Sequence, residues 1–190
     1  AIQFKNICKL RWVVDDEADE DVPNSVSDEE KYGIRQQLVP VLVSLASAPS
    51  PSQAILSQLS ESIALVASYD FPDAWPSLID ELVSQLSTDN HHILLSVLST
   101  SHAIFKRWRS QFRSDALYME INLVLGKMAN PLLELLQRMH SLLMDPSTPS
   151  STMQPLAMCL MLLLQLFYDL SAQDLPPQFE DAIPTLSPMF

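Results

Sequence analysis

Residues 50–78, SPSQAILSQLSESIALVASYDFPDAWPSL, contain the signals of one helix, a proline-marked turn and the start of a second helix. Ser50 to Gln53 have the form of a capping box with proline at the first helical position, where no N–H is needed. Asp73 is a candidate N-cap for the helix that follows the turn. Between these two starts, apolar residues recur at spacings of three and four, which predicts one buried helix face: Leu56, Leu59, Ile63, Val66 and Ala67.

Similar start signals recur along the chain at intervals of 40–46 residues. Ser27 and Glu30 form another capping box, and further N-cap candidates are Asn90, Ser114 and Ser151. A pair of helices at this period is typical of HEAT and armadillo solenoids. We therefore expect an all-α fold, a HEAT-repeat α-solenoid of antiparallel helix pairs wound into a right-handed superhelix.

This period divides the chain into helical pairs. We expect pairs over residues 27–70, 73–113 and 114–173, with a helix over 1–14 before them and the start of another over 178–190. In the last pair, the first helix is expected from Asp115 to Met144, and the second, over 151–171, is apolar nearly all round. Such a helix has to be covered on most sides, as happens between stacked repeats. Because both ends of the sequence look interrupted, we expect a segment of a longer protein.

The composition narrows the possible functions. The 190 residues include 11 Lys and Arg against 23 Asp and Glu, a formal net charge of -12, which argues against nucleic-acid binding and favours basic partners. Only two glycines are present, so loops that cradle phosphates are not expected. The longest apolar run, PLAMCLMLLL at 155–164, is shorter than the roughly 20 residues of a membrane span, so we expect no membrane insertion.

The residue types that carry catalysis or bind metals form no known motif. Cys8 and Cys159 are far apart and match neither a disulfide framework nor a zinc site. The histidines occur in no H-E-x-x-H or related pattern: His91, His92, His102 and His140. We therefore expect no enzyme activity, no cofactor and no metal.

Residues 103–113, AIFKRWRSQFR, carry four of the eleven Lys and Arg residues, interleaved with three aromatic residues. On one continuous helix over 90–113, at about 100° per residue, Phe105, Trp108 and Phe112 fall on one arc, which we expect to face the core. The opposite face is expected to carry the polar residues Lys106, Arg107, Ser110 and Arg113, with Arg109 at its edge. Spacing alone leaves open whether these cations bind a protein partner or form a solvated helix end that the dipole favours.

Residues 15–30, DDEADEDVPNSVSDEE, hold nine of the 23 acidic residues. One interpretation is a solvated loop whose last acids favour the start of the following helix. The alternative is a contact for a basic segment of a partner, made by the first six acids: Asp15, Asp16, Glu17, Asp19, Glu20 and Asp21.

Three stretches carry a resemblance to a known family. FPDAWPSL at 71–78 and HAIFKRWRSQFRSDALYMEINLVL at 102–125 resemble the CAS-type exportins, the importin-α re-exporters of the importin-β (karyopherin-β) superfamily. AIQFKNICKLRW at 1–12 is similar to the second helix of that family's first repeat. The resemblance extends more loosely over nearly all 190 residues and identifies the sequence with the N-terminal part of the family's solenoid.

The resemblance implies a receptor that shuttles between nucleus and cytoplasm through the pore and its FG-repeat proteins. Such a receptor binds Ran-GTP and importin-α cooperatively and returns importin-α to the cytoplasm. In this family the second helices of the early repeats line the concave surface and receive Ran, and here they correspond to 1–14, 50–70 and 90–113. The implied Ran-binding candidates are Lys5, Asn6, Lys9, Lys106, Arg107, Arg109, Ser110 and Arg113.

The family's first helix and its later repeats are not in this sequence, so part of the Ran and cargo surfaces is not expected on it.

Two alternatives to this function stay open. Another karyopherin-β receptor with different cargo, or a HEAT scaffold without a transport role, would share the fold.

Overall fold

The computed structural model describes residues 1–12 and 25–187. Over these ranges the chain is helical and forms no strand, which confirms the all-α prediction. The helices are α1 (Ile2–Arg11), α2 (Asp28–Ala46), α3 (Gln53–Asp70), α4 (Leu78–Val83), α5 (His91–Phe105), the short 3-10 helix η1 (Lys106–Ser110), α6 (Asp115–Met144), α7 (Ser150–Ser171) and α8 (Pro177–Leu186).

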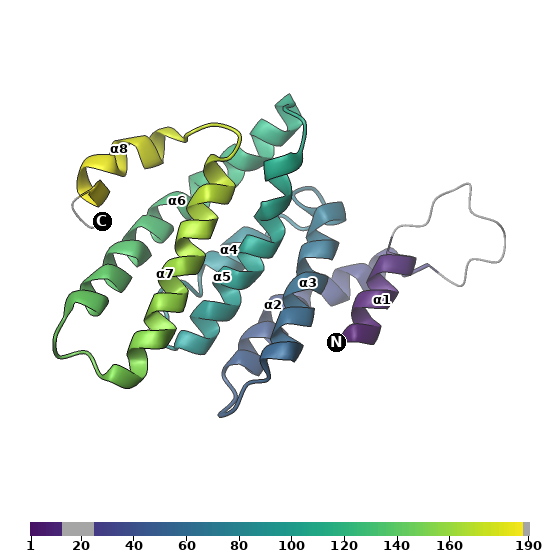
Figure 1. Cartoon of the computed structure of the whole chain (residues 1–190). Helices are drawn as coiled ribbons and strands as arrows, with labels where there is room; N and C mark the ends of the chain where they lie inside the picture. Colours follow the sequence, from purple (N-terminus) through teal and green to yellow (C-terminus); the bar gives the residue numbers. More distant parts are fainter. Residues whose placement is uncertain (13–24, 188–190) are drawn as a thin grey trace.

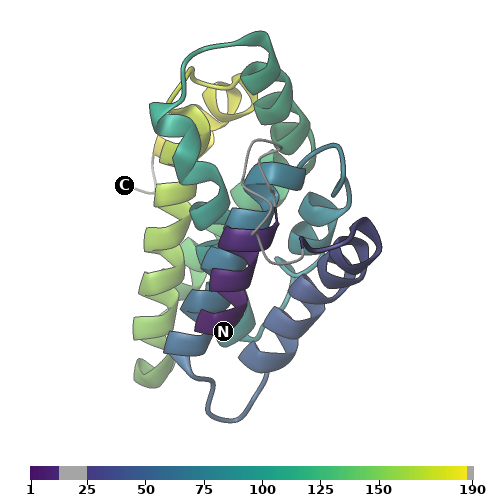
Figure 2. The same cartoon turned by 90° about the vertical axis from the view of Figure 1, so that its right-hand side faces the viewer.

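The helices are stacked in two layers (Figure 1). In the first, which we call the odd layer, α3 lies between α1 and α5, and α7 packs on the other side of α5. In the second, the even layer, α4 contacts α2 and α6, and α8 contacts α6. Contacts of α2 with α3 and of α6 with α7 join the layers, as the view from the α1 end shows (Figure 2). This arrangement is the expected helical solenoid.

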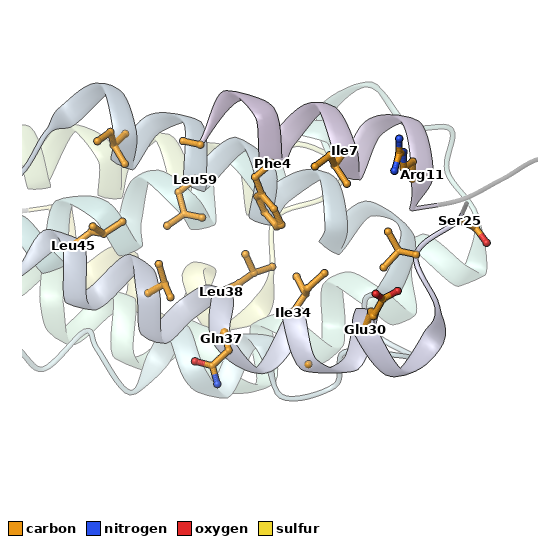
Figure 3. A pocket seen from close by; sticks show the side chains of 15 residues that line it. Phe4, Ile7, Arg11, Ser25, Glu30, Ile34, Gln37, Leu38, Leu45 and Leu59 are labelled. Carbon is orange, nitrogen blue, oxygen red and sulfur yellow. The ribbon is translucent and has the colours of Figure 1, made fainter. Parts of the chain in front are cut away.

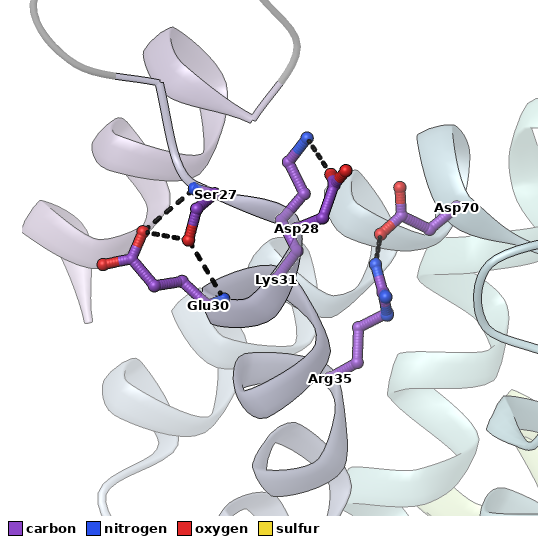
Figure 4. A network of polar contacts seen from close by, with 6 residues as sticks. All are labelled: Ser27, Asp28, Glu30, Lys31, Arg35 and Asp70. Atoms are coloured by element: carbon purple, nitrogen blue, oxygen red, sulfur yellow. Dashed lines mark hydrogen bonds and ion pairs between the residues drawn. The ribbon is translucent and has the colours of Figure 1, made fainter.

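Three of the predicted caps are confirmed. Ser27 Oγ accepts a hydrogen bond from the N–H of Glu30, and the Ser27 N–H donates to the Glu30 carboxylate, so the capping box is complete (Figure 4). Asn90 accepts the N–H groups of the first turn of α5, and Ser114 accepts the N–H of Leu117. Each cap satisfies backbone donors that have no partner inside the helix.

Three other predicted starts are wrong. The N-cap of α3 is Ser52 rather than Ser50, and α7 follows Pro149 rather than Ser151. Asp73 caps no helix, because residues 71–77 form a turn and α4 begins only at Leu78. The prolines at 72 and 76 donate no N–H and restrict the residue before them, which delays the helix.

Large aromatic residues anchor the core between the layers. Trp12, Trp75 and Trp108 are each at most 1% exposed, and they join a single core cluster with the leucines of both layers. A largely buried ion pair joins the first half of α2 to the end of α3, where Arg35 lies 2.6 Å from Asp70 (Figure 4). The turn 71–77 therefore carries a buried tryptophan and directly follows the aspartate of this ion pair.

One helix of the described chain, α7, is long and apolar enough by length and composition to cross a membrane, with a mean hydropathy of 1.4. It packs against α5, α6 and η1 and buries Leu156, Leu163 and Leu166. These contacts make α7 the fourth helix of the odd layer.

Candidate protein-binding surface

The basic segment 103–113 is not one continuous helix. The α-helix α5 ends at Phe105, η1 covers the next five residues, and Gln111 is extended. Phe105 and Trp108 are buried as predicted, and their rings stack with centroids 4.7 Å apart. Phe112 is 96% exposed, so its predicted place in the core is wrong. The change to 3-10 and then extended backbone breaks the angular spacing on which that prediction depended.

The three arginines of this segment are bound within the fold. Arg107 pairs with Glu120 of α6, and Arg109 pairs with Asp169 of α7. The Arg113 guanidinium donates to the backbone carbonyl of Gln173, over 2.6 Å. Burial raises the pKa of the Glu120 carboxyl, and the positive charge of Arg107 opposes that rise. These arginines fasten the segment to the following pair of helices.

Asp169 is the centre of this attachment. Its side chain is fully buried, and its second oxygen lies 2.7 Å from Nδ1 of His102 on α5. Next along the chain, Tyr168 stacks under the Arg109 guanidinium at 4.4 Å. Gln173 donates to the carbonyls of Trp108 and Gln111. The sequence alone did not identify these residues. The single acid of α7 could have indicated them, because a carboxylate that is buried in so apolar a helix needs polar partners.

The lysines, in contrast, lie on the exposed face of the odd layer. Lys5 of α1 donates a hydrogen bond to Glu61 of α3. This bond and the charges of Lys5 and Lys106 lower the pKa of Glu61. Lys9 is exposed one helical turn after Lys5, and Asn6 is also exposed. Within residues 1–12 and 25–187, neither Lys9 nor Lys106 forms a salt bridge.

Small residues line a shallow groove on the same face. The groove has a volume of about 200 Å³ and lies between α3, α5 and α7, where Ser57, Ser99 and Met158 are among its walls. Beneath it, the hydroxyls of Ser60 and Thr100 are buried and lie 2.7 Å apart, which joins α3 to α5. Ser110 is exposed, and its hydroxyl donates to the carbonyl of Arg107. We call the exposed face of α1, α3, α5 and η1 the lysine face.

A larger, apolar groove opens between α1 and the even layer. It has a volume of about 890 Å³, and Phe4 and Ile7 of α1 point across it toward Ile34 and Leu38 of α2 (Figure 3). Arg11 lies at one end with Ser25 and Glu30 (Figure 3). Across the groove α1 faces α2, while α1 packs mainly on α3 of its own layer.

The remaining candidates are the acidic residues near the N-terminus, the residue types that bind metals and the two cysteines. The acidic residues proposed to bind a basic segment lie outside the described residues: Asp15, Asp16, Glu17, Asp19, Glu20 and Asp21. Among the described residues, no three His, Cys, Asp or Glu side chains are grouped to hold a metal ion. Burial raises the pKa of both thiols, Cys8 and Cys159, to about 11, which keeps them protonated.

Comparisons with known proteins identify the family. The family described as Cse1 matches residues 104–190. Exportin-2 of Pagrus major is 39% identical over 97% of this chain, and the importin-alpha re-exporter of Schizosaccharomyces pombe is 36% identical over 95%. Exportin-2 of Homo sapiens is 36% identical over 97%. The chain spans 18% of the length of each of these relatives.

The fold agrees with this relationship. A solved structure described as the exportin Cse1 in its cargo-free, cytoplasmic state superimposes with a TM-score of 0.79 at 34% identity. It covers 98% of this chain, which corresponds to 19% of that protein. The resemblance inferred from residues 1–12, 71–78 and 102–125 is thereby confirmed. The chain belongs to the CAS-type exportin family of the importin-β superfamily.

Proposed function

We propose that the chain is part of a nuclear export receptor that binds Ran-GTP together with importin-α and returns importin-α from nucleus to cytoplasm. The observation that carries the proposal is the lysine face, an exposed cationic surface on a chain of net charge -12. The names exportin-2 and importin-alpha re-exporter among the relatives support the transport role. Passage through the pore would add contacts with FG-repeat proteins, and the receptor would shuttle between the two compartments.

On this proposal the lysine face receives Ran. Lys9 and Lys106 are exposed and Lys5 is one-third exposed, so their ammonium groups can reach carboxylates or carbonyls of a partner. Asn6 and Ser110 add short polar groups beside them. The three arginines hold η1 in place by their bonds to Glu120, Asp169 and the Gln173 carbonyl, and so they act on the surface by positioning Lys106.

We also propose that the layers correspond to repeats. In this organisation α1 is the second helix of the first repeat, and α2 with α3, α4 with α5, and α6 with α7 form the next three. The helix α8 begins the repeat that follows. The apolar groove beside Phe4 and Ile7 is then the position at which the first helix of the first repeat packs, since every other odd-layer helix has an even-layer neighbour.

The proposal is tested by titrating Ran loaded with GTP or GDP against the full-length protein, with and without importin-α. Wild type is compared with the triple variant K5S, K9S and K106S. Because these side chains are at least one-third exposed, each substitution is expected to cost about 0.2–1 kcal/mol of binding and to matter less at high salt.

K127S serves as the matched control, because Lys127 lies on α6 of the even layer and pairs with Asp80. It should bind Ran-GTP as wild type does. Equal affinity for the two nucleotide forms of Ran would favour a scaffold without a transport role. Unchanged binding by a well-folded triple variant would remove the lysine face from the Ran site.

A further inference from the structure

Another hollow opens beside the turn that follows α3 and the start of α6. It has a volume of about 610 Å³ and is lined by the turn after α3, by Gln111, Phe112 and Ser114, and by the first turns of α6. No residue of α1, α3, α5 or α7 lines it. We call it the Phe112 groove, after the exposed residue on its wall; its other walls include Pro72, Asp73, Met119 and Leu123.

The groove exists because α4 begins late. Lys127 of α6 pairs with Asp80 of α4, and Arg138, three turns later, donates to the carbonyls of residues 86–88 in the segment that follows α4. The two helices therefore run side by side in the same direction. Since α4 begins only at Leu78, the first turns of α6 face the proline turn instead of a helix.

Apolar side chains are left uncovered there. Phe112 is 96% exposed, Met119 is 72% exposed and Leu123 is 42% exposed. Met119 and Leu123 are one helical turn apart, so they share a face of α6. Aromatic and methionine side chains that gather in one exposed hollow mark a site of protein contact, because apolar surface gains from being covered.

The charges along the groove select a cationic occupant. Asp73 and Glu120 are the ionisable residues of its wall, and no Lys or Arg lines it. Glu120 is already paired with Arg107. Asp73 is exposed and forms no salt bridge with the described part of the chain, so its carboxylate is available to a partner.

We propose that the Phe112 groove binds a short peptide segment of a partner protein, one that carries a large apolar side chain next to a lysine or arginine. The apolar side chain would lie between Phe112 and Met119, and the cation would meet Asp73. The volume is within the range of about 300–1,000 Å³ that is usual for binding pockets. Neither Lys5, Lys9 nor Lys106 lines the groove.

The test uses the chain labelled with ¹³C at the methionine methyl groups and a synthetic peptide with Lys-Leu-Phe-Lys at its centre. The Met119 signal should shift on titration, while the signal of Met144, exposed at the far end of the same helix, should stay. F112S and M119S should each weaken binding about tenfold, as for an anchor in a contact. D73N should weaken it several-fold and reduce its salt dependence.

M144S is the matched control, because it makes the same change on the same helix at similar exposure and should bind the peptide as wild type does. A Met119 signal that does not move at millimolar peptide would overturn the proposal. Equal binding of a peptide with glutamates in place of the lysines would overturn the assignment to a cationic segment. A concentration-dependent dimer that F112S abolishes would show that a second copy of the chain occupies the groove instead.

Discussion

The guanidinium of Arg109 binds the carboxylate of Asp169, which lies 60 residues further along the chain. The carboxylate is fully buried, and His102 lies 2.7 Å from its other oxygen. A buried charge is tolerated only when it is paired, so this cluster joins the end of α5, η1 and α7 into one unit. The arginines of the basic segment thus bind carboxylates and a backbone carbonyl of the same chain.

Replacing Asp169 by alanine should destabilise the fold. The change leaves Arg109 and His102 without their acceptor, and removing one partner of a buried pair typically costs about 3–5 kcal/mol. We expect about 3 kcal/mol, at the lower end, because Arg109 is one-third exposed and can regain water. Urea unfolding followed by circular dichroism measures this. Asp181→Ala on α8, an exposed acid, is the control and should leave the midpoint unchanged.

Trp75→Ala should destabilise the chain by about 3–5 kcal/mol, the usual cost of removing a fully buried large aromatic side chain. The indole is 1% exposed and fixes the turn between α3 and α4 in the core. Tyr69→Ala, at a half-exposed ring near the end of α3, is a control and should have a much smaller effect. Equal unfolding midpoints for the two variants would show that Trp75 does not anchor the turn.

Glu30 should make stability depend on pH. Hydrogen bonds from the N–H and the hydroxyl of Ser27 lower the pKa of Glu30 below its ordinary value of 4.5. A carboxyl whose pKa is lower in the folded state stabilises the fold above its ordinary pKa, and this contribution is lost as the pH falls through the folded value. Glu30→Gln should therefore be less stable than wild type at pH 7, and the difference should vanish in strong acid. Glu29→Gln, at the exposed neighbouring acid, is measured beside it for comparison.

The two cysteines should react slowly with thiol reagents. Because burial raises the pKa of Cys8 and Cys159 to about 11, few thiolates exist at pH 8, and both side chains are at most 1% exposed. Labelling with iodoacetamide should therefore follow unfolding and become fast in concentrated urea. Rapid labelling of the native chain, measured by mass spectrometry, would contradict the described burial.

Local signals predicted the helices well. The caps at Ser27, Asn90 and Ser114 and the apolar spacing within each helix depend on residues close in sequence, so they can be found without a structure. The turn at 71–77 was misjudged because two prolines outweigh the capping tendency of Asp73. The hydrogen bonds and ion pairs of the arginines could not be predicted, because their partners lie 13 to 60 residues away along the chain. Hydrophobic periodicity does not determine how the elements that carry these partners are rotated toward the arginines.

The last prediction separates the exposed, partner-binding role of Lys106 from the fold-stabilising role of Arg107. It compares the variants Lys106→Ser and Arg107→Ser at adjacent positions. Lys106 is exposed and forms no salt bridge within the described ranges, so its variant should fold with wild-type stability, within about 0.5 kcal/mol. Arg107→Ser leaves the carboxylate of Glu120, whose side chain is only 15% exposed, without its cation. We expect a loss of about 2–3 kcal/mol at pH 8.

The loss in Arg107→Ser should shrink at low pH. Burial already raises the pKa of Glu120, and removing the opposing charge of Arg107 raises it further. An acid whose folded pKa is raised costs stability above that pKa, and this cost is lost as the pH falls toward the ordinary value, so the loss should be smaller at pH 5 than at pH 8. Adding Glu120→Gln to Arg107→Ser should rescue stability at pH 8 and remove the pH dependence. Urea unfolding of wild type, Arg107→Ser, Glu120→Gln and the double variant at both pH values completes the cycle. A loss of stability that depends neither on pH nor on residue 120 would mean that Arg107 stabilises η1 by another contact.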